Sequence, residues 1–184
     1  MNLHRLGAGV FTIADFLSPE ECAHYISRSE RMGYSEAAVR TDDGDRLHKE
    51  ARNNDRVVFD DADLAHHLFS RARPLLPAVL DGWQLSGFNE RFRYYRYDRD
   101  QQFTWHLDGT VRLSPSRESV LTFMVYLNDD FEGGSTEFGW ESVKPVRGMA
   151  LGFPHRLRHQ GAAVRSGLKY VLRTDVLYDA GDAT

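Results

Sequence analysis

The chain has 184 residues, a length that fits one domain with a single sizeable core. Hydrophobic residues make up 41% of it and charged residues 27%, proportions that are typical of a folded globular protein. The formal net charge of -4 provides no overall attraction to nucleic acid or to an anionic membrane, so we expect neither as a partner.

A single cysteine, Cys22, excludes an intramolecular disulfide and fits a reducing compartment. Met1 to Gly9 contains no long apolar run, so we expect no signal peptide. No stretch approaches the roughly 20 apolar residues that a membrane helix needs. The sequence therefore predicts a cytoplasmic protein with one domain over residues 1–184, and nothing in it indicates an oligomeric state.

The N-terminal region begins with a short apolar run, Val10 to Ile13, which predicts an edge strand. A helix should follow, because Ser18 can cap it and Pro19 suits its first turn. We expect this helix to continue to about Arg31 and to end near Gly33.

A charged segment without apolar periodicity, Thr41 to Asp55, predicts a long loop, and long loops in small domains are often functional. Arg56 to Phe59 is the next predicted strand. Asp61 can cap a second helix, which Pro74 interrupts or ends.

From residue 88 onward the pattern predicts strands separated by turns rich in glycine, asparagine and proline. Helices followed by closely spaced strands favour an α+β fold, or a β-sandwich with a helical flank. The predicted strands are Arg91–Tyr97, Val120–Leu127, Ser135–Trp140, Met149–Phe153 and Lys169–Tyr178.

The segment Trp105 to Asp108 holds the first chemical motif. On a strand, His106 and Asp108 would project to the same side, where an imidazole and a carboxylate form two corners of a metal site. A second histidine would complete the facial triad of non-haem iron(II) oxygenases. By itself the motif is weak, because a surface histidine and aspartate beside the turn at Gly109 would give the same pattern.

Two histidines further along the chain could complete the triad. His159 opens the segment that leads to the last predicted strand, whereas His155 directly follows Pro154 in a turn. We expect His155 to be an exposed loop residue, and we predict that His159 is the ligand.

A fixed cation is the third element. If 2-oxoglutarate chelates the metal, its distal carboxylate needs a charged hydrogen-bond partner. Lys169 lies ten positions after His159, inside an otherwise apolar strand, and Arg173 lies on the same face of that strand.

The C-terminal half of the chain, about residues 88 to 178, resembles the prolyl 4-hydroxylase-type branch of the 2-oxoglutarate/Fe(II) dioxygenases. The resemblance implies a double-stranded β-helix (jelly-roll, cupin-like) catalytic core over residues 88–178. Residues 1–87 would then form a helical flank and a substrate-side loop. The motifs that carry the resemblance are Tyr97 to Asp108, Tyr126 to Phe138, Pro145 to Phe153, His159 with Gly161, and Lys169.

The resemblance implies a role for each matching residue. His106, Asp108 and His159 would bind Fe(II), with 2-oxoglutarate and O2 as co-substrates and ascorbate as a candidate reductant. Lys169 would bind the distal carboxylate, and relatives often carry a smaller polar residue where this chain has Arg173, which makes Arg173 a second candidate. The pocket of the co-substrate would also include Tyr97 and Thr136.

The function implied is hydroxylation of a C–H bond in an amino acid, a peptide or another small molecule. Two alternatives use the same residues: a non-catalytic jelly-roll binding module, and a zinc-dependent enzyme. The complete set of ligands argues against the module, because buried polar groups without a role are costly. Zinc hydrolysis has no need of Lys169. A halide would need the coordination position of Asp108, so we expect hydroxylation rather than halogenation.

The substrate side is predicted from the charged loop. Arg52 and Arg56 could clamp a carboxylate, and Asn54 could bind an amide. The alternative is an ordinary solvated loop. Apolar walls could confine the reaction, although each of these residues is also typical of core packing: Phe103, Trp105, Phe123 and Val125.

Overall fold

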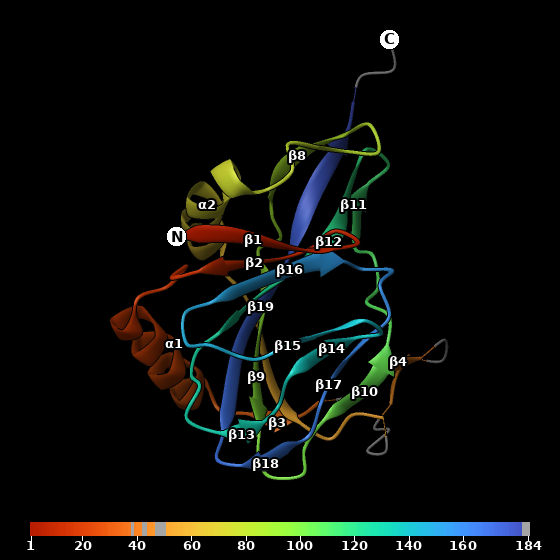
Figure 1. The fold of residues 1–184 in the computed structure, drawn as a ribbon. Coiled ribbons are helices and arrows are strands. Elements are labelled where there is room, and N and C mark those ends of the chain that lie inside the picture. The colour runs from red at the N-terminus through yellow and green to blue at the C-terminus, as the bar shows by residue number, and fades with distance from the viewer. Residues whose placement is uncertain (38, 42–43, 47–50, 182–184) are drawn as a thin grey trace.

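The computed structural model describes residues 1–37, 39–41, 44–46 and 51–181. Within these residues the larger sheet is antiparallel and has 11 strands, with a main path in the order β1-β2-β16-β12-β19-β9-β6-β3 (Figure 1). Its strands are β1 Asn2–Gly7, β2 Val10–Ala14, β3 Ser35–Glu36, β6 Asp55–Asp60, β7 Val79–Leu80, β8 Trp83–Phe88, β9 Arg91–Tyr97, β11 Arg112–Ser114, β12 Arg117–Tyr126, β16 Ala150–Pro154 and β19 Lys169–Ala180.

A smaller sheet in the order β10-β17-β14-β15 faces the larger one on the side away from the helices (Figure 1). The two facing sheets form the predicted jelly-roll core, and the α+β fold class is confirmed. The remaining strands pair as β4 with β5 and β13 with β18. The bounds are β4 Val39–Thr41, β5 Gly44–Arg46, β10 Phe103–His106, β13 Glu132–Gly133, β14 Thr136–Phe138, β15 Glu141–Val143, β17 His159–Gly161 and β18 Val164–Ser166.

Two hydrophobic cores lie on opposite faces of the larger sheet because successive strand residues point in opposite directions. Tyr94 of β9 and Leu172 of β19 belong to the core shared with the helices. Their neighbours Tyr95 and Val171 belong to the core between the two sheets. The chemistry-bearing residues of β9 and β19 therefore sit on the face that meets the smaller sheet.

Two helices, α1 Pro19–Met32 and α2 Ala62–Ala72, cover the other face of the larger sheet (Figure 1). Their predicted caps are confirmed: Ser18 accepts from the N–H of Glu21, and Asp61 accepts from the N–H of Leu64. α1 ends at its C-cap, Gly33, as expected. Among the described residues, no helix is long and apolar enough to span a bilayer.

The end of α2 also follows the prediction. A 3-10 turn, Arg73–Leu75, continues directly from the helix and contains Pro74. Proline lacks the N–H that another turn of α-helix would need.

Two predictions for the N-terminal half are wrong. Val10 to Ile13 lies in β2, which is not an edge strand, because β1 pairs with one side of it and β16 with the other. The predicted loop from Thr41 to Asp55 contains β5, which pairs with β4, although residues 42, 43 and 47–50 of that loop lie outside the described residues. Both helices lie in the flank before residue 88, as predicted, and β1, β2, β3 and β6 of the same flank extend the larger sheet.

Candidate metal centre

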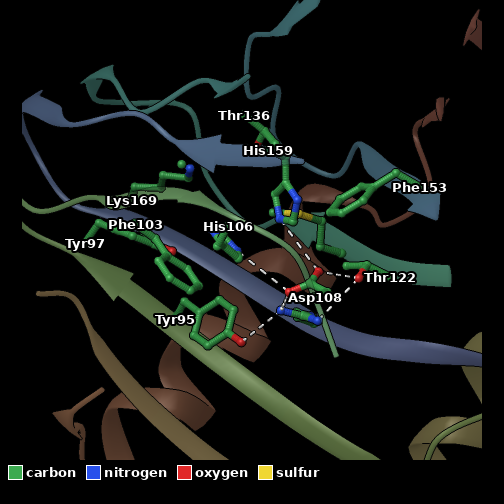
Figure 2. A pocket seen from close by; sticks show the side chains of 13 residues that line it. Tyr95, Tyr97, Phe103, His106, Asp108, Thr122, Thr136, Phe153, His159 and Lys169 are labelled. Carbon is green, nitrogen blue, oxygen red and sulfur yellow. Dashed lines mark hydrogen bonds and ion pairs between the residues drawn. The ribbon is translucent and has the colours of Figure 1, made fainter. Parts of the chain in front are cut away.

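Two histidines face each other across neighbouring strands of the smaller sheet. β10 and β17 pair with His106 opposite His159, and the two ring centroids lie 4.2 Å apart. The carboxylate oxygens of Asp108 lie 3.7 Å from Nε2 of His106 and 3.7 Å from Nε2 of His159 (Figure 2). One donor atom from each of the three side chains lies within 4.8 Å of the others. The structure therefore brings the three predicted ligands together.

Asp108 reaches the histidines by a different route from the predicted one. β10 ends at His106, so the alternation of strand residues does not extend to Asp108. Instead, the N–H of Asp108 donates to the carbonyl oxygen of His155 at 3.0 Å. This hydrogen bond ties the segment after β10 to the segment after β16.

Both triad histidines direct a lone pair toward Asp108. Nδ1 of His106 lies 2.6 Å from the carbonyl oxygen of Thr104, and Nδ1 of His159 lies 2.9 Å from that of Leu157. A carbonyl oxygen only accepts, so the hydrogen of each neutral ring is on Nδ1 and Nε2 is unprotonated. Burial lowers the pKa of His106 to about 4 and also lowers the pKa of His159, so both rings are neutral at pH 7.

The carboxylate of Asp108 is held by one partner on each oxygen. Nη1 of Arg173 lies 3.0 Å from Oδ1, and the hydroxyl of Thr122 donates to Oδ2 at 2.6 Å. Burial opposes ionisation of this group, but the charge of Arg173 and the hydrogen bond from Thr122 outweigh burial and hold the pKa of Asp108 well below its usual range. The centre thus offers two neutral imidazoles and one ionised carboxylate.

His155 is buried, with 2% of its surface exposed, so the prediction of an exposed loop residue is wrong. Its Nε2 lies 2.9 Å from Oγ of Ser119, and its Nδ1 lies 3.0 Å from Oγ1 of Thr122. Because the Thr122 hydroxyl donates its only hydrogen to Asp108, it must accept from Nδ1 of His155. His155 supports Asp108 through Thr122, and its ring is not part of the converging set.

Lys169 is a buried cation on the pocket wall, with 2% of its surface exposed. Its Nζ donates to the carbonyl oxygen of Gly134 at 2.6 Å and lies over the rings of Tyr97 and Tyr126. Among the described residues, no carboxylate lies within ion-pair distance of Nζ. Burial lowers the pKa of Lys169 to about 7. Thr136 lies nearby and accepts a hydrogen bond from the hydroxyl of Tyr126.

One small pocket, partly open to solvent, is lined by these groups (Figure 2). Lys169 and Arg173 lie four positions apart on the same face of β19, which places them roughly 13 Å apart along the strand. Sequence reasoning missed several lining residues, because a strand pattern alone does not reveal which buried side chains meet a ligand. These are Tyr95, Thr122, Met124 and Phe153.

The predicted substrate-side residues fall into two groups. Arg52 and Asn54 are buried rather than solvated, with 6% and 0% of their surfaces exposed, and Nε of Arg52 donates to Oδ1 of Asn54 at 2.8 Å. Arg56 lies in β6, in register with Tyr95 of β9. The structure therefore joins Arg52 with Asn54 in one buried unit.

The predicted apolar walls are only partly in place. Phe103 lines the pocket, and its ring stacks on His106 with 3.4 Å between centroids. Trp105 is 39% exposed. Phe123 and Val125 belong to the core beneath the helices, so ordinary packing accounts for them.

Comparison with known protein families finds one match that covers the centre. The sequence model of the 2OG-Fe(II) oxygenase superfamily matches residues 92–174. Prolyl 4-hydroxylase 1 from Arabidopsis thaliana is 27% identical over 197 residues. That match covers 88% of this chain and 66% of the relative, so the chain spans slightly less than two thirds of the relative's length.

Solved structures share the fold at low sequence identity. A viral collagen prolyl hydroxylase from Paramecium Bursaria Chlorella virus-1 has a TM-score of 0.66 and 22% identity, covering 93% of this chain and 97% of that one. A Pseudomonas putida prolyl-4-hydroxylase has a TM-score of 0.69 and 14% identity, covering 95% and 94%. A Trichoplax adhaerens prolyl hydroxylase, in complex with a hypoxia inducible factor peptide, has a TM-score of 0.68 and 14% identity, covering 94% and 84%.

The hydrogen bond from Thr122 to Asp108 should strengthen metal binding. Replacing Thr122 with Val keeps the side-chain shape but removes the donor to Oδ2 and the acceptor for His155. We expect the affinity for cobalt(II) or iron(II), titrated under nitrogen, to fall about 10- to 100-fold, as for other partners of metal ligands. Thr122→Ser keeps the hydroxyl and should bind metal almost as well as the wild type. A loss in Thr122→Ser with unchanged affinity in Thr122→Val would instead assign the effect to packing of the methyl group.

Proposed function

We propose that this chain is a 2OG-Fe(II) oxygenase that couples oxidative decarboxylation of 2-oxoglutarate to hydroxylation of a C–H bond, as its match to that superfamily over residues 92–174 supports. His106, Asp108 and His159 would hold the iron. The observation that carries the proposal is the meeting of this donor set, in one pocket, with a buried lysine that has no carboxylate partner among the described residues. The substrate is an amino acid, a peptidyl residue or another small molecule.

The residues present fit an Fe(II) centre. Two neutral imidazoles and one carboxylate form the 2-His-1-carboxylate set of non-haem iron oxygenases, and all three line a pocket that is partly open to solvent. Bound iron supplies the activation of O2 that drives both decarboxylation and C–H oxidation. A metal requires deprotonated ligands. Burial keeps both histidines neutral, and Arg173 keeps Asp108 ionised. Phe103 and Phe153 give the same pocket an apolar wall, which limits the access of water to the bound groups.

Lys169 is the better of the two candidate anchors for the distal carboxylate of 2-oxoglutarate. Its ammonium has a single carbonyl oxygen as hydrogen-bond partner, so it can still donate to a carboxylate. Arg173 is already engaged by Asp108 at 3.0 Å and by Asp175 at 3.4 Å. Tyr97, in register with Lys169, and Thr136 would complete this end of the pocket.

The buried lysine also separates this function from the alternatives. A zinc hydrolase with the same three ligands would gain nothing from a desolvated cation on the pocket wall. In a binding module without catalysis, the burial of Asp108, Arg173 and Lys169 would destabilise the fold and serve no function. Asp108 occupies the coordination position that a halide would need, which favours hydroxylation over halogenation.

The reaction is tested by measuring succinate release with iron(II), 2-oxoglutarate, O2 and a substrate panel, with mass spectrometry of the products. We expect succinate and a product that is heavier by one oxygen atom. His159→Ala should abolish both iron binding and succinate release, whereas His155→Ala should keep most of the bound iron. Loss of iron from His155→Ala alone, or zinc-dependent hydrolysis by the wild type, would contradict the proposal.

Removing the charge of Lys169 should weaken the binding of 2-oxoglutarate. Lys169→Met keeps most of the apolar stem and loses one charge-assisted hydrogen bond, which is worth about 1.5–3 kcal/mol. Calorimetric titration should show an affinity that is about 10- to 150-fold lower. The exposed Lys144 gives a matched control, since Lys144→Ala should bind like the wild type. Unchanged affinity in Lys169→Met would transfer the role to Arg173.

Binding of 2-oxoglutarate should be linked to proton uptake. Without a ligand, the pKa of Lys169 is about 7, and a bound carboxylate favours the protonated form. Titrations at pH 8 in two buffers of different ionisation enthalpy should therefore reveal uptake of a fraction of a proton, and Lys169→Met should take up none.

Between pH 7 and the ordinary lysine pKa of 10.5, the unfolded chain binds a proton that the folded protein does not. The contribution of Lys169 to the free energy of unfolding should therefore increase with pH in this window when no ligand is bound.

A further inference from the structure

A second buried cation lies beside the pocket and is not used by the proposed chemistry. Arg52 has 6% of its surface exposed. Its guanidinium carbon lies 4.6 Å from the ring centroid of Tyr95 and 4.5 Å from that of Phe103, and both rings line the pocket. Asn54 accepts from Nε, but the buried Nη2 has no hydrogen-bond partner. A donor is therefore buried and left unsatisfied next to the candidate metal centre.

The stacking order places this cation close to the metal ligands. Phe103 stacks on the imidazole of His106, with 13° between the rings. That face of Phe103 is thereby occupied, so the guanidinium of Arg52 must lie over the opposite face. Arg52 is consequently separated from a metal ligand by the thickness of one aromatic ring.

A second guanidinium, that of Arg173, lies at the hydroxyl end of Tyr95. The hydroxyl of Tyr95 lies 3.5 Å from Nη1 of Arg173, whose Nε is also buried without a hydrogen-bond partner (Figure 2). Burial alone would raise the pKa of the Tyr95 hydroxyl, but Arg173, Arg52 and Arg93 together hold it below its ordinary value. Three guanidiniums and two carboxylates, Asp108 and Asp175, thus lie around Tyr95, which leaves an excess of positive charge.

The nearby carboxylates do not compensate Arg52. Asp108 pairs with Arg173, while Asp175 is shared between Arg173 and Arg93. Among the described residues, no carboxylate lies within ion-pair distance of Arg52. The two aromatic faces offset part of the cost of burying its charge, but they leave the Nη2 hydrogen bonds unmade. Such a group is suited to an anion that arrives with a ligand.

The distal carboxylate of 2-oxoglutarate does not meet this need. In the proposed function it lies at Lys169, and the rest of the co-substrate is drawn to the metal. Arg52 lies over Tyr95 and Phe103, whereas Lys169 lies over Tyr97 and Tyr126, so Arg52 is available to an anionic group of the molecule that is oxidised.

We infer that Arg52 binds the carboxylate of the prime substrate, and that the substrate is a free amino acid. The inference rests on the proposed function and narrows its substrate class. Asn54 positions the guanidinium by accepting from Nε. A carboxylate held there presents carbons a few bonds away to the metal centre, so the same contact supplies affinity and selects the carbon that reacts.

Binding of matched carboxylates and amides tests this inference. The protein is loaded with iron(II) and 2-oxoglutarate under nitrogen, so that no turnover occurs. It is then titrated calorimetrically with the proteinogenic L-amino acids, with their primary amides, and with a proline-containing tripeptide blocked at both ends. We expect at least one amino acid to bind at least about tenfold more tightly than its amide. Arg52→Gln should reduce this preference to less than about threefold.

Three further variants keep the test decisive. Asn54→Asp places an internal carboxylate against Arg52 and should also remove the preference, even if Arg52→Gln does not fold. Arg52→Lys keeps a charge but loses the planar fork, and should retain part of the preference. Arg91→Gln removes an exposed arginine from β9, which pairs with Asp60, and should behave like the wild type.

The outcomes separate this inference from the proposed function. Amides or the blocked tripeptide binding as well as free carboxylates to the wild type would overturn it, as would the absence of binding by every free amino acid. A carboxylate preference that survives in both Arg52→Gln and Asn54→Asp would also overturn it. If the wild type fails to bind 2-oxoglutarate in an iron-dependent manner during loading, the proposed function itself is wrong.

Discussion

A buried, ionised carboxylate is the constraint around which the centre is organised. Asp108 has to be compensated wherever it lies beneath the surface, because an unpaired charge in a protein interior is costly. Arg173 and Thr122 each hold one oxygen, and the two imidazoles face the same group. Arg173, which balances the charge of Asp108, is itself buried and forms a second ion pair with Asp175. Several residues of the pocket wall are therefore needed to stabilise the charge of Asp108.

Strand β19 combines these requirements on one rigid element. It lies between β12 and β9 in the larger sheet, with both of its edges hydrogen-bonded. Its alternation directs Lys169, Val171 and Arg173 toward the pocket, and Leu172 toward the helices. The spacing between the two cations is thus fixed by backbone geometry, and a ligand between them meets a preorganised field.

Local patterns in the sequence predict strand β9 and the caps of both helices, but they do not predict which residues of the site are buried. β9 was predicted with its observed bounds, because an alternating aromatic pattern specifies a strand, and the caps of both helices are equally local. The burial of His155 could not be predicted, since its partners Ser119 and Thr122 lie on β12, more than 30 positions away. The same holds for Arg52, whose burial depends on Tyr95 and Phe103. A charged loop pattern carries no information about such distant contacts.

The choice between lysine and arginine follows from how each cation tolerates an empty site. Lys169 can release its proton when its site is empty, because burial lowers its pKa to about 7, so the pocket need not hold a permanent counter-charge there. Arginine stays protonated at any physiological pH, so it cannot lose its charge in this way. Arg173 therefore has a permanent partner in Asp108, and Arg52 rests between two aromatic faces. An adjustable cation suits a co-substrate that enters and leaves in every cycle. A permanent one suits recognition, since it disfavours any ligand that buries it without supplying a negative charge.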